Sequence, residues 1–578
     1  MPRQLVFILC ALFLAACGTV STSTPTQTLE STNTIAPPTA TATITSTPMP
    51  AVTNTPANTP SSTPGSHLTV VPTVRPLSQE ALTSIPRVTA IPASDSFPTL
   101  IPTMQPETIS AELQVALQFR DLDALDGRPL SQITRWKYGY RFEWIDTNHL
   151  LLLPRVGQYE NNGRNTQHQL VVASLVSRKV WVPPVDQFIQ GEWGRTKLPR
   201  WSKKLGVFII PNQDKSIVDI YTLEGKKLKT YTGNLTGVSP SGTKILVDSL
   251  WIDLESGKTV EFAWAKNNRD RFGILPIWSS DETQVYAHIG GYFYGNAKTG
   301  EGFEISTKSV DEQMGMGRLV HSYGQWVLND SQLLVQLSYI DDSFPNFIPL
   351  FDPSEKTYHN LSALAGISTG DGSNINCIGT SVSPDGIHVW AKCFDGNYLV
   401  NLITLKTKTF PGYYQYVDFN WSPDGQFAWL DDNDSYNPRL RVLSVARQEL
   451  ISFPIEPAYD TVVWWHPTQN IAAYPSQNGK SLILLDAETM SVREVILPEG
   501  FCNTERNPPR CRIIWNPSGD QLSIKANGGS IWQLDYPGLE TLEQLTPPAD
   551  EFGWSPDGTK LAFTNHAGIF ILEVGPNP

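Results

Sequence analysis

The sequence predicts an all-β fold, a β-propeller of four-stranded blades preceded by a disordered tether. From about residue 111 onward, short strand-like runs alternate with turns, and no long stretch has a clean helical period. One strand–turn–strand unit recurs along this part of the chain, most clearly at 551–563. Its turn, Trp-Ser-Pro-Asp-Gly, places Pro556 where the backbone dihedral must be fixed and Gly558 where a left-handed conformation is required.

Residues 1–17 have the pattern of a lipoprotein signal peptide. Arg3 is followed by an apolar run from Leu5 to Leu14, which is too short to span a membrane comfortably and fits the hydrophobic region of a signal peptide. The ending Leu-Ala-Ala-Cys resembles the lipobox of bacterial lipoproteins. That resemblance implies a lipid on Cys17 and an extracytoplasmic protein anchored to the bacterial membrane, at the cell surface or in the periplasm. The alternative is an ordinary secretory leader that is cleaved after a small-x-small site.

Residues 18–108 are predicted to form a disordered linker. They consist mainly of Ser, Thr, Pro, Ala and Asn, with few large apolar side chains. Such a segment cannot bury enough surface to offset the entropy of ordering, and its prolines keep it extended. We therefore expect a stalk that holds a propeller domain, residues 109–578, away from the membrane.

The propeller domain contains ten copies of the unit, with a mean spacing of about 46 residues, the length of one four-stranded blade. The turn motif is complete at Trp421 and Trp554, and the copy at Val382 differs only in its first residue. The structural anchors that we expect in the clearer copies are Trp278, Val382, Trp421, Trp465, Trp515 and Trp554. The other copies begin at Trp144, Trp201, Val238 and Trp326.

These repeats resemble the WD-like repeats of TolB-like propellers, which carry the same Trp-Ser-Pro-Asp-Gly signature. The resemblance covers roughly residues 140–578 and implies a propeller fold. The copies at Trp144, Trp201 and Trp326 lack the proline, so the number of blades stays between 8 and 10. One ring is favoured over two because no linker-like stretch interrupts residues 140–578.

The last blade is short of a strand. After the turn at 555–558 the sequence offers only two strand-like runs, 560–565 and 568–574. An open propeller would expose unpaired strand edges. We therefore predict that a strand from 111–143 pairs with 560–575, and Glu112 to Phe119 is the segment we expect to form it.

Net charge limits the classes of partner, and the spacing of the cysteines predicts their redox state. Lys and Arg number 43 against 56 Asp and Glu, for a net charge of −13, and no basic stripe is present, which argues against nucleic-acid binding. Outside the leader, the cysteines form two close pairs, which predict two local disulfides in an exported protein, with unpaired buried thiols as the alternative. The candidates are Cys377, Cys393, Cys502 and Cys511.

No stretch of the sequence carries a convincing catalytic or metal-binding pattern. Asp431, Asp432 and Asp434 gather oxygen ligands as calcium loops do, but without the Gly and distal Glu of an EF-hand, so a solvated hairpin loop is expected and no metal is predicted. The GxSxG match at 366–370 is followed by loop-forming residues and not by a helical pattern, so Ser368 is not expected to be a nucleophile. We predict no catalytic residue and no cofactor.

Aromatic and acidic repeat residues are expected to be structural. The repeat tryptophans should pack between blades, so an aromatic platform for a sugar would come from Trp136, Trp193 or Trp464, although packing is the favoured role for each of them. The repeat aspartates are expected to be turn residues, namely Asp385, Asp424 and Asp557.

Together these patterns predict a binding or scaffolding module for a protein, peptide or glycan at the cell envelope, held to the membrane through its N-terminal lipid. The alternative is an extracellular glycan hydrolase or lyase with carboxylates in the propeller channel. Two inward-facing carboxylates about 5–10 Å apart in a polar pocket would favour that enzyme. A purely structural or sensory ectodomain is a third interpretation.

Overall fold

The computed structural model divides the chain into two compact units, 1–63 and 64–578, and every residue that it describes belongs to the second. The fold is therefore that of the second unit alone. The described residues are 67–78, 106–136, 140–159, 165–185, 188–189, 199–212, 215–262, 276–288, 292–305, 320–338, 348–367, 377–393, 396–410, 419–432, 439–452, 463–476, 478–502 and 511–575.

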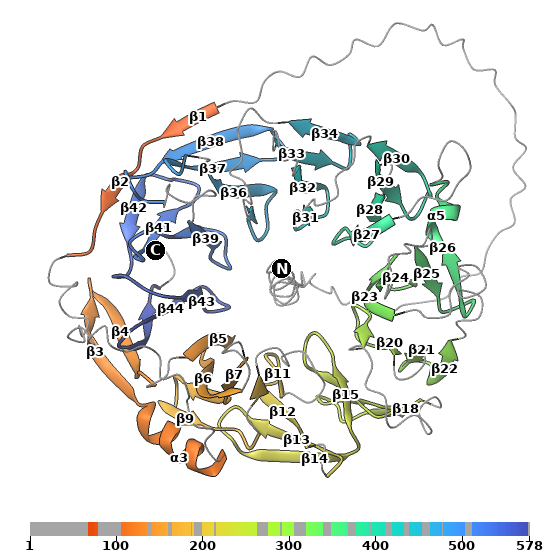
Figure 1. The fold of residues 1–578 in the computed structure, drawn as a ribbon, viewed down its shortest axis with the longest axis horizontal. Helices are drawn as coiled ribbons and strands as arrows, with labels where there is room; N and C mark the ends of the chain where they lie inside the picture. The colour runs from red at the N-terminus through yellow and green to blue at the C-terminus, as the bar shows by residue number, and fades with distance from the viewer. Residues whose placement is uncertain are drawn as a thin grey trace, which may run out of the picture. The chain divides into compact units, whose positions relative to one another are not determined.

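The described strands form ten sheets that follow one another around a ring (Figure 1). Each sheet is one propeller blade, and the strand that precedes its repeat turn lies innermost. From the inside outwards, blade 1 has β5 (Tyr140–Asp146), β6 (His149–Tyr159), β8 (Val171–Ser174) and β9 (Lys179–Trp181), with β7 (Asn165–His168) and β10 (Phe188–Ile189) paired beyond β6. Blade 2 has β11 (Arg200–Ser202), β12 (Val207–Asn212), β13 (Ile217–Thr222) and β14 (Lys227–Thr232).

The next five blades are four-stranded and antiparallel throughout. Blade 3 has β15 (Leu235–Val238), β16 (Lys244–Val247), β17 (Leu250–Asp253) and β18 (Thr259–Glu261); blade 4 has β19 (Ile277–Trp278), β20 (Gln284–His288), β21 (Tyr292–Asn296) and β22 (Glu301–Ile305). Blade 5 has β23 (Val320–Val327), β24 (Gln332–Ser338), β25 (Pro349–Asp352) and β26 (Thr357–Asn360), followed by helix α5 (Leu361–Leu364). Blade 6 has β27 (Cys377–Val382), β28 (His388–Cys393), β29 (Gly396–Asn401) and β30 (Thr407–Phe410); blade 7 has β31 (Phe419–Trp421), β32 (Phe427–Asp432), β33 (Arg439–Ser444) and β34 (Glu449–Ser452).

The last three blades each include strands from the N-terminal part of the described chain. Blade 8 has β35 (Trp464–Trp465), β36 (Ile471–Pro475), β37 (Ser481–Asp486) and β38 (Ser491–Ile496), with β1 (His67–Val70) on its outer edge. Blade 9 has β39 (Arg512–Trp515), β40 (Gln521–Lys525), β41 (Ile531–Asp535) and β42 (Thr541–Gln544), with β2 (Thr73–Arg75) outside. Blade 10 has β43 (Phe552–Trp554), β44 (Lys560–Asn565) and β45 (Gly568–Glu573), followed outwards by β4 (Arg128–Thr134) and β3 (Phe119–Leu125).

The all-β propeller is confirmed, with ten blades in one ring. Each of the ten predicted repeat positions lies at or near the end of an innermost strand, including the three copies without proline at Trp144, Trp201 and Trp326. The turn that follows each position leads into the second strand of the same blade. One copy of the unit therefore specifies the inner hairpin of one blade.

The repeat tryptophans join neighbouring blades by hydrogen bonds as well as by packing. The indole Nε1–H of Trp465 donates to the carbonyl of Asn420 at 3.2 Å, and Asn420 directly precedes the repeat position of the preceding blade. The same bond to a backbone carbonyl recurs around the ring, from Trp515 to Trp464 (3.1 Å), from Trp326 to Ile277 (3.3 Å) and from Trp144 to Gly553 (2.9 Å). Trp421 donates instead to the side-chain hydroxyl of Ser381 in the preceding blade, at 3.1 Å. We call this set of bonds the tryptophan belt.

The turn of each unit also packs against the preceding blade. In blade 3, Gly242 has φ +72, and a Cβ built on it would lie 2.6 Å from the Cα of Ser202 in the turn of blade 2. Only glycine fits both the dihedral and the space. At Gly242 glycine is thus required by contact between blades as well as by the turn, whereas at Gly558 an added Cβ would make only ordinary contacts, 3.5 Å or more from its neighbours, and the positive φ alone requires glycine.

The apolar core lies between consecutive blades. One cluster joins Leu484 of blade 8 to Ile524 of blade 9, and another joins Leu150 of blade 1 to Ile569 of blade 10. Because each blade buries both of its faces against neighbours, ring closure is needed to cover the last one.

Ring closure is confirmed, but the expected segment was wrong. Strand β4 pairs antiparallel with β45, with Ile133 opposite Ile569. Residues 112–119 lie instead mainly in helix α3 (Pro106–Ala116). The buried residues Ile109, Leu113 and Leu117 recur every four positions, which is a helical stripe and not strand alternation.

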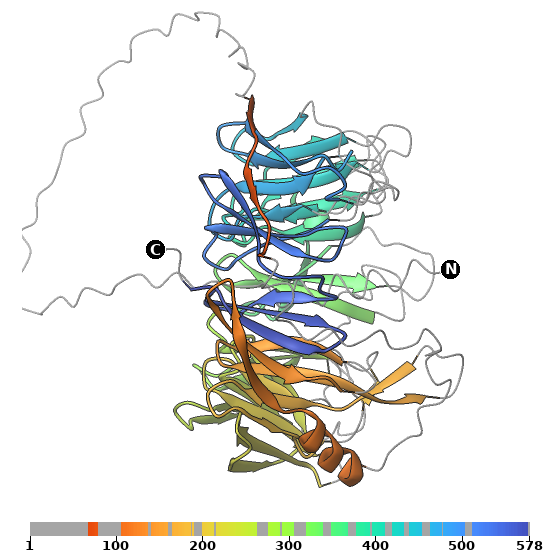
Figure 2. The ribbon, with the colours of Figure 1, turned by 90° about the vertical axis from the view of Figure 1, so that its left-hand side faces the viewer.

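The prediction of a disordered linker across 18–108 does not hold for residues 106–108, which begin helix α3, or for residues 67–78, which we call the strap. β1 pairs parallel with β38, and β2 pairs parallel with β42. Beyond β2, Leu77 is 4% exposed and packs into the core of blade 10. Each of these strands is a short run that contains Thr and Val. So short a run does not stand out in the average composition of about 90 residues on which the prediction of disorder was based. Figure 2 shows the strap running along the outer side of the ring.

Candidate functional site

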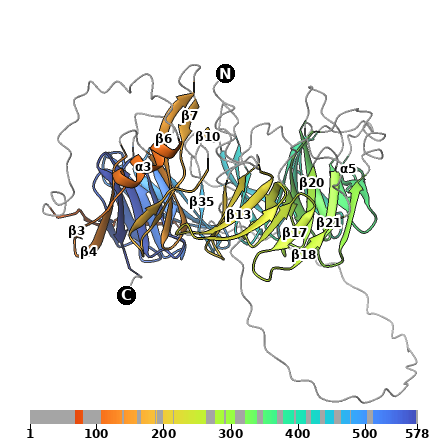
Figure 3. The ribbon, with the colours of Figure 1, turned by 90° about the horizontal axis from the view of Figure 1, so that it is seen from below.

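The two faces of the ring differ in the length of their connections. One face carries the repeat turns, such as 555–559, and the turns between third and fourth strands, such as 487–490; we call it the turn face. The other carries the segments between blades, such as 262–276 and 497–511, and we call it the connection face. In Figure 3 the connection face is at the top, where β6 and β7 project beyond the other strands. Long connections on a rigid scaffold are where binding residues concentrate.

A hollow of about 370 Å³ lies in the connection face between blades 9 and 10. Three short segments form it: the turn after β40, the connection between β42 and β43, and the turn after β44. Its lining residues are mostly polar and comprise Lys525, Asn527, Gly528, Gly529, Pro548, Ala549, Asp550, Asn565 and His566.

Backbone hydrogen bonds fix the shape of the hollow. The Asp550 amide donates to the Thr564 carbonyl at 2.7 Å, and the Ala549 amide donates to the Gly529 carbonyl at 3.0 Å. From blade 10, Arg135 donates from its guanidinium to the carbonyl of His566 at 2.9 Å. The walls are therefore preformed, which lowers the entropic cost of binding a ligand there.

The electrostatics of the hollow are dominated by Lys525. Its ammonium donates to the carbonyl of Asp550. Burial, together with the charge of Arg512, lowers the pKa of Lys525, although Asp550 opposes the shift. Within the described lining, Asp550 is the single carboxylate. The hollow thus offers amide, ammonium and imidazole groups for hydrogen bonding to a polar ligand.

The repeat aspartates are turn residues on the opposite face. Asp424 accepts a hydrogen bond from the Ser422 hydroxyl at 2.7 Å, and Asp557 accepts one from Ser555 at 2.6 Å. Asp385 accepts the equivalent bond from its own serine. Burial raises the pKa of Asp557, but bonds from Ser555 and Thr559 lower it on balance, so the carboxylate is held charged by its own turn.

The two aromatic platform candidates that the structure describes pack against the core and do not form a sugar-binding surface. Trp136 is buried, and its Nε1–H donates to the Arg155 carbonyl at 2.7 Å. Trp464 packs against the core between blades 8 and 9. Trp193 lies outside the described residues. Packing is the role of both described candidates.

The weaker chemical patterns are placed only in part. Asp431 and Asp432 end β32, and Asp434 lies outside the described residues, as do the side chains of the other two. No group of three metal-ligating side chains occurs in the part of the chain that the structure describes. Gly366 of the GxSxG match follows helix α5, whereas a nucleophile elbow follows a strand; Ser368 lies outside the described residues.

Both cysteine pairs are joined. Cys377 lies directly opposite Cys393 in the β27–β28 pair, and Cys502 bonds to Cys511 across the connection between blades 8 and 9. Both bridges are at the connection face. Cys17 lies outside the described residues.

None of the helices in the described ranges is both long and apolar enough to cross a lipid bilayer.

A histidine that the sequence analysis did not single out joins blades 1 and 2 at the turn face. His149 is largely buried, and its Nδ1–H donates to Asp146 at 3.0 Å while its Nε2–H donates to Glu224 of blade 2 at 3.2 Å. Burial lowers the pKa of His149, but Asp146 and Glu224 raise it on balance above its ordinary value of 6.5. The imidazolium therefore stabilises the contact between the blades below about pH 6.5, and that contribution is lost as pH rises through the raised pKa.

Replacing Glu224 by Gln is expected to lower the free energy of unfolding by about 0.5 kcal/mol at pH 5.5; the effect is small because the glutamate side chain is 55% exposed. At pH 8.5 we expect no effect, because His149 is then neutral. Urea unfolding at the two pH values measures the difference. Glu255→Gln is the matched control, because its partner Lys204 keeps its charge at both pH values. An equal deficit for Glu224→Gln at both pH values would contradict the assigned protonation of His149.

Searches of protein-family models and of curated proteins found no match. Solved structures match in part. A structure of the eukaryotic initiation factor is 11% identical, with TM-score 0.39, covering 71% of this chain and 97% of that chain. A chain of the mitotic checkpoint complex is 14% identical, with TM-score 0.28, covering 52% and 86%. The β-propeller domain of Cps50 (Swd1) from Myceliophteria thermophila is 13% identical, with TM-score 0.24, covering 49% and 93%. These likenesses assign neither a family nor a function.

Proposed function

We propose that this chain is a lipid-anchored, extracytoplasmic binding module that presents the connection face of its propeller to a protein, peptide or glycan of the cell envelope. The observation that carries the proposal is the asymmetry of the ring: tight turns on one face, and long connections with a preformed polar hollow on the other. A rigid ring with variable connections on one face is suited to recognition. The Trp-Ser-Pro-Asp-Gly repeats support a relationship to TolB-like propellers.

The position of the strap supports a tethered arrangement. The first described strand, β1, lies on the outer edge of blade 8 and begins at His67. A tether that ends at this strand joins the ring at its rim and not at the connection face. The lipobox-like ending at Cys17 supplies the proposed lipid.

Replacing Cys17 by Ala is expected to move the protein from the membrane fraction to the soluble fraction, because acylation of this residue is the proposed anchor. Metabolic labelling with a radioactive fatty acid should mark the unmodified chain and not the variant. Cys10→Ala is the matched control and should leave both results unchanged. An unlabelled chain that is found in the soluble fraction would contradict the anchor and leave the binding role to be tested separately.

The binding role is tested with the full chain, purified in detergent, as bait for native envelope extracts. We expect retention of a defined envelope component that is lost when the hollow is filled by Gly528→Trp and kept when the turn-face residue Ser256 is replaced by Trp. Gly528 lines the hollow, and a Cβ on it would meet no atom within 4 Å, so the variant should fold. Retention of nothing by the unmodified chain would overturn the binding role.

The glycan hydrolase remains the alternative without an observation in its favour. It requires two carboxylates that face one pocket, and the described lining of the hollow provides Asp550 alone. Release of reducing sugar from an envelope glycan would establish it in place of the binding role.

A further inference from the structure

We propose that Arg141, Arg155 and Arg200 form a binding site for an oxyanion, a carboxylate or phosphate group, at the connection face of blades 1 and 2. The proposal rests on the proposed function of that face and names the chemistry of the group that the face recognises. These residues share no sequence motif. They come together only through the strand pairing and through the position of β5 and β11 as innermost strands, which the sequence alone does not give.

The first two arginines are close neighbours in blade 1. In the β5–β6 pair, Arg141 lies opposite Leu153, and Arg155 is two residues further along β6. Such diagonal neighbours on one face of an antiparallel pair have their Cα atoms roughly 7–8 Å apart. Arg155 in turn lies opposite His168 of β7. The strand register therefore gathers two guanidinium groups and an imidazole at one end of the blade.

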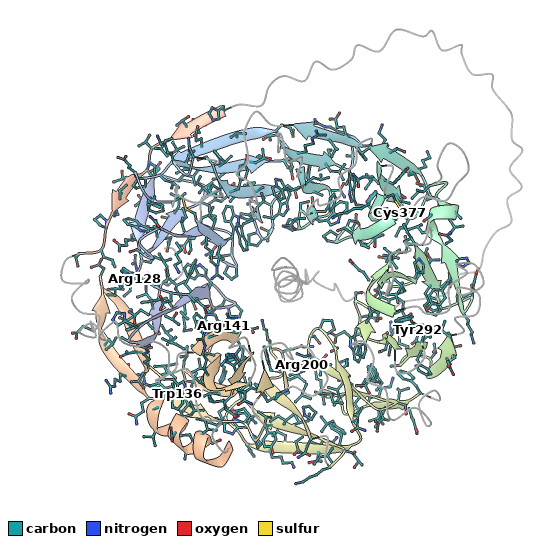
Figure 4. All side chains as sticks on the ribbon, viewed as in Figure 1. Arg128, Trp136, Arg141, Arg200, Tyr292 and Cys377 are labelled. Carbon is teal, nitrogen blue, oxygen red and sulfur yellow. A yellow bond between two sulfur atoms is a disulfide. The ribbon has the colours of Figure 1, made fainter. Side chains whose placement is uncertain are left out.

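Arg200 supplies the third cation from the next blade. It is the first residue of β11, the inner strand of blade 2, and directly precedes Trp201, as Glu143 precedes Trp144 in blade 1. Arg200 is therefore level with Glu143, two residues nearer the turn face than Arg141. Figure 4 shows Arg141 and Arg200 on the inner side of the ring, on adjacent blades. A group bound on the inner side of the ring between blades 1 and 2 would contact both.

Within the part of the chain that the structure describes, these arginines have no counter-ion. Among the described residues, the guanidinium groups of Arg141, Arg155 and Arg200 make no hydrogen bond and no ion pair. Two acidic residues share β5 with Arg141. Asp146 bonds to His149 at the turn face, and burial raises the pKa of Glu143 although the charge of Lys203 in blade 2 opposes the shift. By contrast, Arg128 makes an ion pair with Glu543 at 2.7 Å. The chain has a net charge of −13, so acidic residues that could pair with arginines outnumber its cations. Arginines that lie together without such a partner among the described residues therefore indicate a site for an anionic ligand.

The site is partly desolvated, and this strengthens its field. All three arginines are half-buried, and burial lowers the pKa of Arg200. Burial, with a smaller contribution from the charges of Arg155 and Arg141, lowers the pKa of His168 to about 4, so that its imidazole is neutral at pH 7. The imidazole therefore adds no charge to the site, and its Nδ1–H donates to the Leu153 carbonyl at 3.2 Å. Planar guanidinium groups match the geometry of carboxylate and phosphate oxygens.

The test uses the full chain in detergent at low ionic strength, with inorganic phosphate and citrate as probes; the two distinguish a phosphate from a carboxylate ligand. We expect the unmodified chain to bind at least one probe in calorimetry. The double variant Arg141→Gln, Arg155→Gln should raise the dissociation constant at least tenfold, and so should Arg200→Gln. Arg447→Gln, on the turn face, is the matched control and should leave the constant unchanged.

A second readout does not depend on the ligand. Because an unpaired, half-buried cation is destabilising, Arg200→Gln should raise the thermal midpoint of the ligand-free protein, whereas loss of a structural arginine would lower it. A lower midpoint for Arg200→Gln, or equal probe binding by the double variant and the unmodified chain, would overturn the site. If the unmodified chain binds neither probe yet retains an envelope component, the oxyanion site fails and the proposed function stands. Retention of no component would overturn the proposed function itself.

Discussion

Replacing Ile133 by Asp is expected to destabilise the ring by about 4 kcal/mol or more, because it places a carboxyl group in an apolar site without a partner. Ile133 is fully buried in β4, opposite Ile569 of β45. The substitution acts on the sheet in which β3 and β4 complete a blade with the C-terminal strands β43, β44 and β45. Urea unfolding measures the loss, and limited proteolysis should show early cleavage around residues 117–136.

Two controls separate closure from general damage. Ile133→Val keeps the apolar contact and should cost about 1 kcal/mol. Arg120→Asp introduces the same side chain at an exposed position of the neighbouring strand β3 and should cost less than about 0.5 kcal/mol. If Ile133→Asp unfolds at the same urea concentration as Arg120→Asp, the β4–β45 pair does not hold the ring together.

The propeller could be predicted from sequence because the repeat encodes it locally. Proline, aspartate and glycine specify a turn within five residues, and an aromatic residue before the turn specifies what the inner strand buries. Each copy then needs only its neighbours, so counting copies counts blades. Even Trp144, Trp201 and Trp326, which lack the proline, begin true blades, because all ten copies share an apolar residue near the end of the inner strand and not the proline of the turn.

The outer strands and the candidate sites could not be predicted in the same way. The strap pairs through its backbone, and most of its side chains are exposed, so its sequence carries little pattern beyond a few β-branched residues. The segment that forms helix α3 was expected to be the closing strand, a role that β4 has in the structure. Over so short a run, the four-residue spacing of Leu113 and Leu117 fits both a helical period and strand alternation. Arg141 and Arg155 meet only through the register of β5 and β6, and no spacing in the sequence reports that register.

Replacing Trp144 by Ala is expected to cost about 3–5 kcal/mol, because it removes a large buried side chain between blades 10 and 1 together with its hydrogen bond. Trp144→Phe retains most of the packing and loses only the bond from Nε1 to the Gly553 carbonyl, which should cost about 1 kcal/mol. Trp429→Phe is the matched control: Trp429 is equally buried, but its Nε1 has no hydrogen-bond partner among the described residues, so its substitution should cost clearly less.

The tryptophan belt makes a further comparison possible. Trp465 makes the same bond to Asn420, 45 residues away, that Trp144 makes to Gly553, 409 residues away. If the ring unfolds as one unit, both native bonds are lost in the same step, and Trp144→Phe and Trp465→Phe should lower the free energy of unfolding equally. If the blades instead unfold in sequence from the closing blade, Trp144→Phe would lower an early transition and Trp465→Phe a later one. Equal shifts in a single urea transition would therefore show that closure by β4 makes the ten blades one cooperative unit, whereas separate transitions would show that closure is the weakest contact of the ring.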